Sequence, residues 1–140
     1  RVANKMPWYP GGQTGYVDVR DIVQFSSLLL ENKNIGQRWL LNGKNMSYAE
    51  IYLLIADKLG IKKKYREAPE WLAKTILLAA NLKKGRFSVP ELVHQVYGSF
   101  SYDASKSLTV EGFRYQEIEK TIEEIARVYL EKKGSINLEY

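Results

Sequence analysis

The feature that most constrains the fold is the segment from Gly12 to Leu30, which runs from a glycine-containing turn into a strand and then a helix. Tyr16–Val19 has strand character. Asp21 stands where a helix N-cap is expected, because its short side chain can accept hydrogen bonds from the first free amides. The sequence therefore predicts an irregular loop over residues 1–15, a strand at 16–19 and a helix from Asp21 to about Glu31.

Four more helices are predicted from apolar spacing and end signals. Ser47 and Glu50 form a capping box for a helix that ends at Gly60. The other three run over residues 69–85, 88–97 and 116–133. In the 69–85 helix the predicted apolar face is Trp71, Leu72, Ile76, Ala79 and Ala80. In the last helix, which Gly134 should end, the residues expected to point inward are Ile118, Ile122, Ile125 and Tyr129.

Strands are few in this pattern. Arg38–Leu41 is predicted as a second short strand and Phe100–Tyr102 as a third, with Asp103 capping a brief turn through Leu108. Two or three such strands do not make an independent sheet. Tyr16–Val19 and Arg38–Leu41 should therefore pair with strands outside this chain, or only with each other. The expected class is a mainly α-helical segment, about five helices with two or three short strands.

Composition limits the classes of function. The 140 residues suit one domain, and no apolar run is long enough to span a bilayer. The absence of cysteine excludes disulfides and thiolate metal sites and agrees with a cytoplasmic location. His94 is the single histidine and does not build a metal site alone, so no metal is predicted. The net charge of +5 is partly local, in a basic cluster of Lys58, Lys62, Lys63, Lys64 and Arg66, which we interpret as solvated surface.

Three segments, in order, carry a resemblance to a known family. They are Gly12–Val23; Arg38–Gly43 with Met46–Ile51 and the closing Leu59-Gly60; and Tyr102–Lys106 with Gly112–Tyr115, ahead of a last helix rich in Glu and Ile. This order is similar to the C-terminal part of extended short-chain dehydrogenases/reductases. That family includes NAD-dependent epimerases and dehydratases and the dihydroflavonol-reductase-like proteins.

The resemblance implies a domain plan and a function. Residues 1–15 would be a substrate-side loop, 16–133 the substrate-binding lobe of a Rossmann-type α/β protein, and 134–140 a loose tail. The N-terminal Rossmann domain, with the NAD or NADP site and the catalytic residues, would lie upstream of Arg1. The parent would be an oxidoreductase, or an epimerase or dehydratase, acting on a carbonyl or alcohol carbon, while this segment alone would be inactive. A homo-oligomer is possible for the parent.

Two motifs of the family have near matches here, and neither is predicted to be functional. Gly12-x-x-Gly15 lacks the third glycine of a dinucleotide-binding turn and precedes a strand, so we predict a plain turn. The catalytic Tyr-x-x-x-Lys spacing occurs at Tyr102…Lys106 and Tyr129…Lys133, without the required upstream context. No catalytic and no cofactor-binding residue is therefore assigned to this chain.

Position in the family pattern nominates Trp8, Tyr9 and Arg20 as substrate-facing residues. Arg20 would contact an anionic or hydroxylated group, or else pair with Asp18 or lie on the surface. Trp8 and Tyr9 would read a ligand or seal a domain junction. The alternative function is a stand-alone basic helical module that binds nucleic acid or an acidic protein, and a third possibility is a sensor that keeps the reductase fold. Substrate, cofactor preference and oligomeric state stay open.

Overall fold

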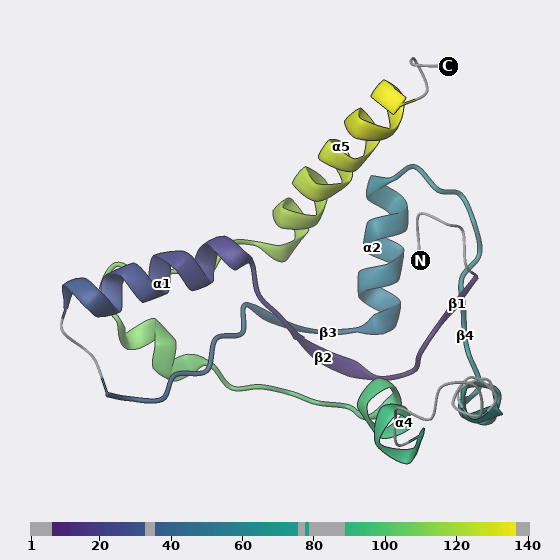
Figure 1. The fold of residues 1–140 in the computed structure, drawn as a ribbon, viewed down its shortest axis with the longest axis horizontal. Helices are drawn as coiled ribbons and strands as arrows, with labels where there is room; N and C mark the ends of the chain where they lie inside the picture. The colour runs from purple at the N-terminus through teal and green to yellow at the C-terminus, as the bar shows by residue number, and fades with distance from the viewer. Residues whose placement is uncertain (1–6, 33–35, 76–77, 79–88, 137–140) are drawn as a thin grey trace. The chain divides into compact units, whose positions relative to one another are not determined.

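The computed structural model describes residues 7–32, 36–75, 78 and 89–136 (Figure 1). In these residues helices alternate with a few short strands, so the mixed class of many helices and few strands is confirmed. The helices are α1 (Val19–Glu31), α2 (Tyr48–Lys58), α4 (Val89–Tyr97), α5 (Ile118–Ile136) and the 3-10 helix η1 (Ser105–Thr109). Residues 70–75 are also helical. The strands are β1 (Trp8–Tyr9), β2 (Gln13–Tyr16), β3 (Lys44–Ser47) and β4 (Arg66–Glu67).

The strands form two separate pairs. β1 pairs with β4 in parallel, and β2 pairs with β3. An isolated parallel bridge joins Gln13 to Ser99. None of the described helices is long and apolar enough to cross a membrane.

The start of α1 differs from the prediction. The strand ends at Tyr16, and Asp18 is the N-cap, with extended backbone and a side chain that accepts from the amide of Arg20. Asp21 lies inside the first turn and is completely buried, where both carboxylate oxygens accept from the amide of Gln116 at 3.2 and 3.3 Å. Two aspartates three residues apart both suit a cap, and the earlier one caps because the later one is engaged by a distant backbone amide.

Both predicted later strands are wrong in position. Residues 37–43 carry no strand, and β3 begins at Lys44, where it finds β2 as a partner. Residues 100–102 are not a strand either, and the only bridge near them in the described chain is the one at Ser99. The prediction relied on strand propensity, whereas a segment forms a strand only where a partner strand lies beside it.

The middle helices agree with the prediction where the structure describes them. α2 begins with the predicted capping box: the amide of Glu50 donates to Ser47 Oγ, and the Ser47 amide donates to the Glu50 carboxylate at 2.7 Å. Gly60 follows the helix with φ of +66°, the left-handed conformation expected of a C-terminal glycine. α4 ends at Tyr97 as predicted, and residue 88, where the predicted helix begins, lies outside the described residues.

The helix predicted over 69–85 is seen at residues 70–75, and its predicted end lies outside the described residues. Of its predicted apolar face, Trp71 is largely exposed and Leu72 is half-buried. The remaining members, at positions 76, 79 and 80, lie outside the described residues.

α5 is longer than predicted and packs differently. It continues through Gly134 to Ile136. Ile118 and Ile122 are buried as predicted, and Ala126 continues their stripe at a spacing of four residues. Ile125 and Tyr129 are 63% and 42% exposed, so their predicted inward placement is wrong. The buried residues are therefore spaced four apart along the helix, and the small Ala126 is buried while the larger Ile125 and Tyr129 are not.

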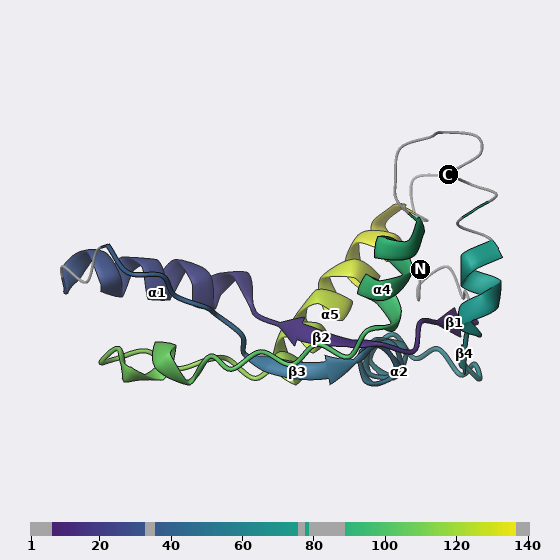
Figure 2. The same ribbon diagram turned by 90° about the horizontal axis from the view of Figure 1, so that it is seen from below.

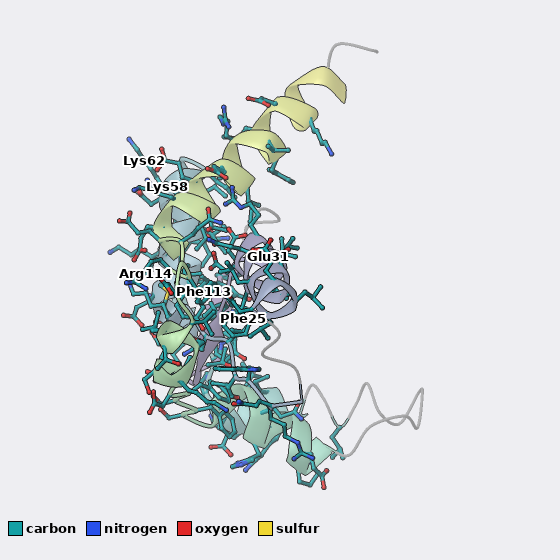
Figure 3. All side chains as sticks on the ribbon, turned by 90° about the vertical axis from the view of Figure 1, so that its left-hand side faces the viewer. Phe25, Glu31, Lys58, Lys62, Phe113 and Arg114 are labelled. Carbon is teal, nitrogen blue, oxygen red and sulfur yellow. The ribbon has the colours of Figure 1, made fainter. Side chains whose placement is uncertain are left out.

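Contacts divide the chain into two compact units, each with its own core. The first unit contains residues 1–14 and 46–100, and the second contains residues 15–45 and 101–140. Buried apolar residues of the first unit include Met46, Ile51, Ala56 and Val93. The second is built on Phe25, Val110 and Phe113, and the rings of Phe25 and Phe113 meet edge to face at 4.8 Å (Figure 3). The predicted domain limits at residues 15, 16 and 133 stay predictions.

Candidate functional site

Two of the three nominated substrate residues, Trp8 and Tyr9, form strand β1 in the first unit. The register places Trp8 beside Arg66 and Tyr9 beside Glu67 (Figure 2 shows the paired strands). Backbone hydrogen bonds of 2.9 and 2.8 Å flank this pairing. A parallel pair of two residues is marginal by itself, so side chains must hold the two segments together.

A cluster of tyrosines supplies that packing. The ring of Tyr9 lies 6.0 Å from that of Tyr52 on α2, and Tyr52 lies 6.4 Å from Tyr65, just before β4. Among the described residues, the hydroxyl of Tyr65 is buried without a hydrogen-bond partner. Trp8 is 37% exposed. Rings of this kind offer apolar surface with a polar group at one end, which is the chemistry of binding an organic ligand.

Tyr97 fixes the end of β4 to α4. Its hydroxyl donates to the backbone carbonyl of Ala68 at 2.7 Å. Burial raises the pKa of Tyr97, and the nearby carboxylates of Glu67 and Glu70 raise it further. The phenol therefore stays protonated and acts as a hydrogen-bond donor that holds the structure.

Arg20, the third nominated residue, belongs to the second unit, whereas Trp8 and Tyr9 belong to the first. Its Nε and Nη2 donate to the two oxygens of Asp18 at 3.0 and 2.7 Å, and its Nη1 donates to Glu124 at 2.7 Å. Thr121 Oγ1 also donates to Asp18, at 2.6 Å. The structure therefore contains the ion pair with Asp18 that the sequence left as an alternative.

This network has clear electrostatic consequences. The hydrogen bonds from Arg20 hold the pKa of Asp18 well below its usual range, although its burial acts in the opposite direction. A two-bond pairing between guanidinium and carboxylate is among the stronger protein interactions. An anionic substrate group would have to compete with Asp18 and Glu124 for Arg20. Substrate contact by Arg20 stays a prediction.

The two Tyr-x-x-x-Lys matches have different geometries. Tyr102 lies outside any helix and Lys106 lies in η1, so they do not share one helix face. Lys106 Nζ instead donates to the carbonyl of Arg38 at 3.1 Å and lies 4.3 Å from the centre of the Trp39 ring. Tyr129 is on α5 and exposed, and the side chain of Lys133 lies outside the described part.

Neither predicted turn glycine offers room for a pyrophosphate. A Cβ at Gly12 would lie 2.5 Å from the carbonyl oxygen of Val96 and 2.6 Å from that of Gly98. A Cβ at Gly15 would lie 2.4 Å from the Asn42 side chain. Gly15 lies within β2 and Gly12 directly before it, so the predicted plain turn is wrong in detail. The space where a side chain would stand at each glycine is filled by this chain.

Metal ligation has no candidate in the described residues, where no group of three or more histidine, aspartate or glutamate side chains is placed to hold an ion. His94 lies on α4, and its ring packs edge-on against Phe100 at 5.5 Å.

The site contains residues that sequence reasoning missed. Tyr52, Tyr65 and Tyr97 carry no motif. The ten tyrosines are spread from Tyr9 to Tyr140, so their positions in the sequence carried no signal that these three would lie near one another. Glu124, 104 positions from Arg20, had no local signal.

No family model matches the chain, and no curated protein matches it. A solved structure described as "Crystal structure of gox2253" is similar, with a TM-score of 0.71 and 18% sequence identity. The match covers 95% of this chain and 42% of that chain. The chain therefore spans less than half the length of the solved structure that it matches, and at this identity the similarity concerns the fold alone.

Proposed function

We propose that this chain is the substrate-binding C-terminal portion of an extended short-chain dehydrogenase/reductase-like protein. The whole protein would transfer a hydride between NAD or NADP and a carbonyl or alcohol carbon of a small organic substrate, or would carry out the related epimerase or dehydratase chemistry. The cofactor and the catalytic residues would be supplied by an N-terminal Rossmann domain outside residues 1–140.

One observation carries the proposal: the helix that continues the first family-like stretch packs in the second unit against residues of the other two. The Phe25 ring of α1 packs on Trp39 at 5.4 Å and on Phe113 at 4.8 Å. The Tyr115 hydroxyl accepts from the amide of Asn42 at 3.1 Å. Chance matches scattered along a chain have no reason to share one core, whereas segments of one family fold do.

The tyrosine cluster gives the proposal a binding surface. Trp8 and Tyr9 lie in the first unit, on β1, and the Tyr9 ring packs near that of Tyr52. They suit a substrate with an apolar or aromatic portion. In this proposal the chain positions the substrate and performs no proton or hydride transfer.

The experiment compares the protein made from the complete reading frame with the chain 1–140. We expect the longer protein to contain Gly-x-x-Gly-x-x-Gly after a strand and Tyr-x-x-x-Lys before Arg1, and to bind NADH or NADPH with tryptophan-sensitized emission. The chain 1–140 should not bind either. Absence of both motifs and of dinucleotide binding in the longer protein would overturn the proposal.

A second candidate rests on the basic cluster. Lys62, Lys63, Lys64 and Arg66 are exposed, and Lys58 is half-buried at the end of α2 (Figure 3 labels Lys58 and Lys62). This surface would suit a nucleic acid or an acidic protein. Binding of a DNA duplex whose affinity falls steeply with salt, and is lost on charge reversal of Lys62 and Lys64, would favour this function.

A further inference from the structure

The short helix that follows β4 exposes two large apolar side chains. Residues 70–75 and residue 78 are helical. Trp71 is 67% exposed and Leu78 is 57% exposed. They are seven residues apart, about two turns, so they lie on the same face of the helix. Leu72 and Ala73, which point toward other sides, are half-buried. The helix is therefore apolar both where it packs and where it faces water.

The start of this helix is fixed to the rest of the first unit. The amide of Ala68 donates to the carbonyl of Tyr9 at 2.8 Å, and the Tyr97 hydroxyl donates to the carbonyl of Ala68 at 2.7 Å. Within the exposed face, the hydroxyl of Thr75 donates to the carbonyl of Trp71 at 2.8 Å. Covering the face would therefore leave the Thr75 donor paired, which removes the usual cost of burying a hydroxyl.

The net positive charge of the chain comes from the same unit. By sequence, the first unit has eleven Lys or Arg and five Asp or Glu, whereas the second unit has ten and eleven. From residue 58 to residue 86, nine residues are basic and only Glu67 and Glu70 are acidic. In Figures 1 and 2 the chain from the end of α2 through β4 to the short helix follows one side of the unit. The exposed basic residues of this stretch include Lys62, Lys63, Lys64, Arg66 and Lys74.

We propose that this side of the first unit binds the surface of a bilayer that contains anionic lipids. The short helix would lie in the plane of the bilayer surface, with Trp71 and Leu78 between the lipids and the basic side chains beside the lipid phosphates. Tryptophan suits this depth because its ring is apolar and its N–H is polar. The proposal goes beyond the proposed function and does not rest on it, since it uses residues of the first unit alone.

Other partners would use less of this surface. A nucleic acid would pair its phosphates with the basic residues, and a base would stack on Trp71, but Leu78 would stay in water. A second copy of the chain would bring together two units that each carry a net charge of +6, which repulsion opposes. An anionic bilayer accepts the apolar face and the positive charge together.

The first test measures binding to lipid vesicles, with the protein made from the complete reading frame. We expect it to float with vesicles of equal parts phosphatidylcholine and phosphatidylglycerol, and not with phosphatidylcholine alone. Binding should weaken as salt is raised, because salt screens the attraction between the basic side chains and the lipid phosphates. No binding to the mixed vesicles overturns the proposal, including the case in which residues outside 1–140 cover Trp71 and Leu78. Equal binding to both kinds of vesicle also overturns it, because the positive charge then contributes nothing.

Two leucine variants separate the apolar face from a general effect of charge. Leu78→Glu alters the proposed face, and Leu53→Glu makes the same change on α2 of the same unit, where Leu53 is 53% exposed. Both variants should keep the wild-type melting temperature. Leu78→Glu should weaken binding to the mixed vesicles by about tenfold or more, because a leucine side chain no longer leaves water. Leu53→Glu should change binding little, and equal effects of the two variants overturn the proposal.

Two lysine variants test the contribution of charge without touching the apolar face. Lys64→Gln should weaken binding to the mixed vesicles about fivefold, the effect of one basic residue near an anionic surface. Lys120→Gln removes the same charge from the second unit, where Lys120 is exposed and pairs with Glu117 at 3.0 Å. It should leave binding unchanged. A loss for Lys120→Gln as large as that for Lys64→Gln contradicts the assignment of the surface to the first unit.

Tryptophan fluorescence shows whether the face enters the bilayer. Lipids with bromine-labelled acyl chains should quench the emission of the bound protein, and Trp71→Phe should abolish most of this quenching while Trp8→Phe keeps it. Quenching that survives in Trp71→Phe overturns the proposal, because Trp71 then lies outside the bilayer. Tighter binding to a DNA duplex than to the mixed vesicles, equal for wild type and Leu78→Glu, would also overturn it and assign the basic residues to nucleic acid.

Discussion

Among the residues of the first unit, the buried hydroxyl of Tyr65 is a clear example of an unsatisfied polar group. It has no described hydrogen-bond partner, whereas Tyr97 donates to the carbonyl of Ala68. A buried polar group without a partner costs about 1–3 kcal/mol, whereas a satisfied bond stabilises by about 1 kcal/mol. The two tyrosines therefore allow a matched comparison, in which the same change to phenylalanine removes an unpaired hydroxyl at one position and a bonded hydroxyl at the other.

We predict that Tyr65→Phe leaves the free energy of unfolding unchanged or raises it by about 1 kcal/mol, while Tyr97→Phe lowers it by about 1 kcal/mol. Urea unfolding of both variants measures this. If Tyr65→Phe is as destabilising as Tyr97→Phe, the Tyr65 hydroxyl has a hydrogen-bond partner after all.

Asp18 should give the chain an acid-sensitive stability. Its pKa is lower in the folded state than in the unfolded state, because Arg20 donates to its carboxylate. Its contribution is therefore present above the unfolded pKa of about 4 and is lost as pH falls through the folded pKa. We predict that Asp18→Ala costs about 1–2 kcal/mol at pH 7, as for loss of an N-cap.

Thermal or urea unfolding from pH 7 to pH 2 tests this prediction. The difference between wild type and Asp18→Ala should shrink below about pH 4. Asp57→Ala, at an exposed position of α2, serves as the control and should show a smaller difference at every pH. A difference for Asp18→Ala that stays constant with pH would show that its carboxylate charge contributes nothing.

At the scale of elements, the backbone just before β2 lies very close to the backbone at the end of α4. Gly12 donates to the carbonyl of Val96 at 3.1 Å, and a Cβ there would lie 2.5 Å from that oxygen. Gly60, by contrast, has open space around it and a left-handed φ. We predict that Gly60→Ala costs about 1 kcal/mol from backbone strain alone. Gly12→Ala should cost clearly more, because two backbone carbonyls must move.

Circular dichroism and urea unfolding of the two glycine variants measure the difference. A cost for Gly12→Ala at or below that of Gly60→Ala would contradict the close approach of residues 12 and 96–98.

The elements that the sequence predicted well are those with a local signal. The capping box of Ser47 and Glu50 and the glycine after α2 are read from neighbouring residues, and both are present. The elements that it predicted poorly depend on distant partners. Lys44–Ser47 rather than residues 38–41 forms the strand because β2 lies beside it, and Asp18 rather than Asp21 caps α1 because Gln116 engages Asp21.

The same distinction applies to the candidate site. Trp8 and Tyr9 were nominated by position in a family pattern, and β1 places Tyr9 against Tyr52. The sequence held no sign that Tyr65 would lie beside Tyr52, because β4 and α2 meet only in the folded unit. Family likeness nominates residues for a binding region, while tertiary packing decides which side chains lie beside them.

At the scale of the whole molecule, the proposed function requires Trp8 to bind substrate rather than to stabilise the fold. Trp8 is 37% exposed, and Trp71, at 67%, is a second surface tryptophan of the same unit that serves as the control. We predict that Trp8→Ala, in the protein made from the complete reading frame, raises KM about tenfold for a carbonyl compound that oxidises NADH or NADPH. A tenfold change corresponds to about 1.4 kcal/mol of lost binding free energy, and the melting temperature should stay within about 2 °C of wild type. Trp71→Ala should change neither quantity. Steady-state kinetics and thermal unfolding of the three proteins test this, and a lowered melting temperature with unchanged KM for Trp8→Ala would assign Trp8 to structure alone.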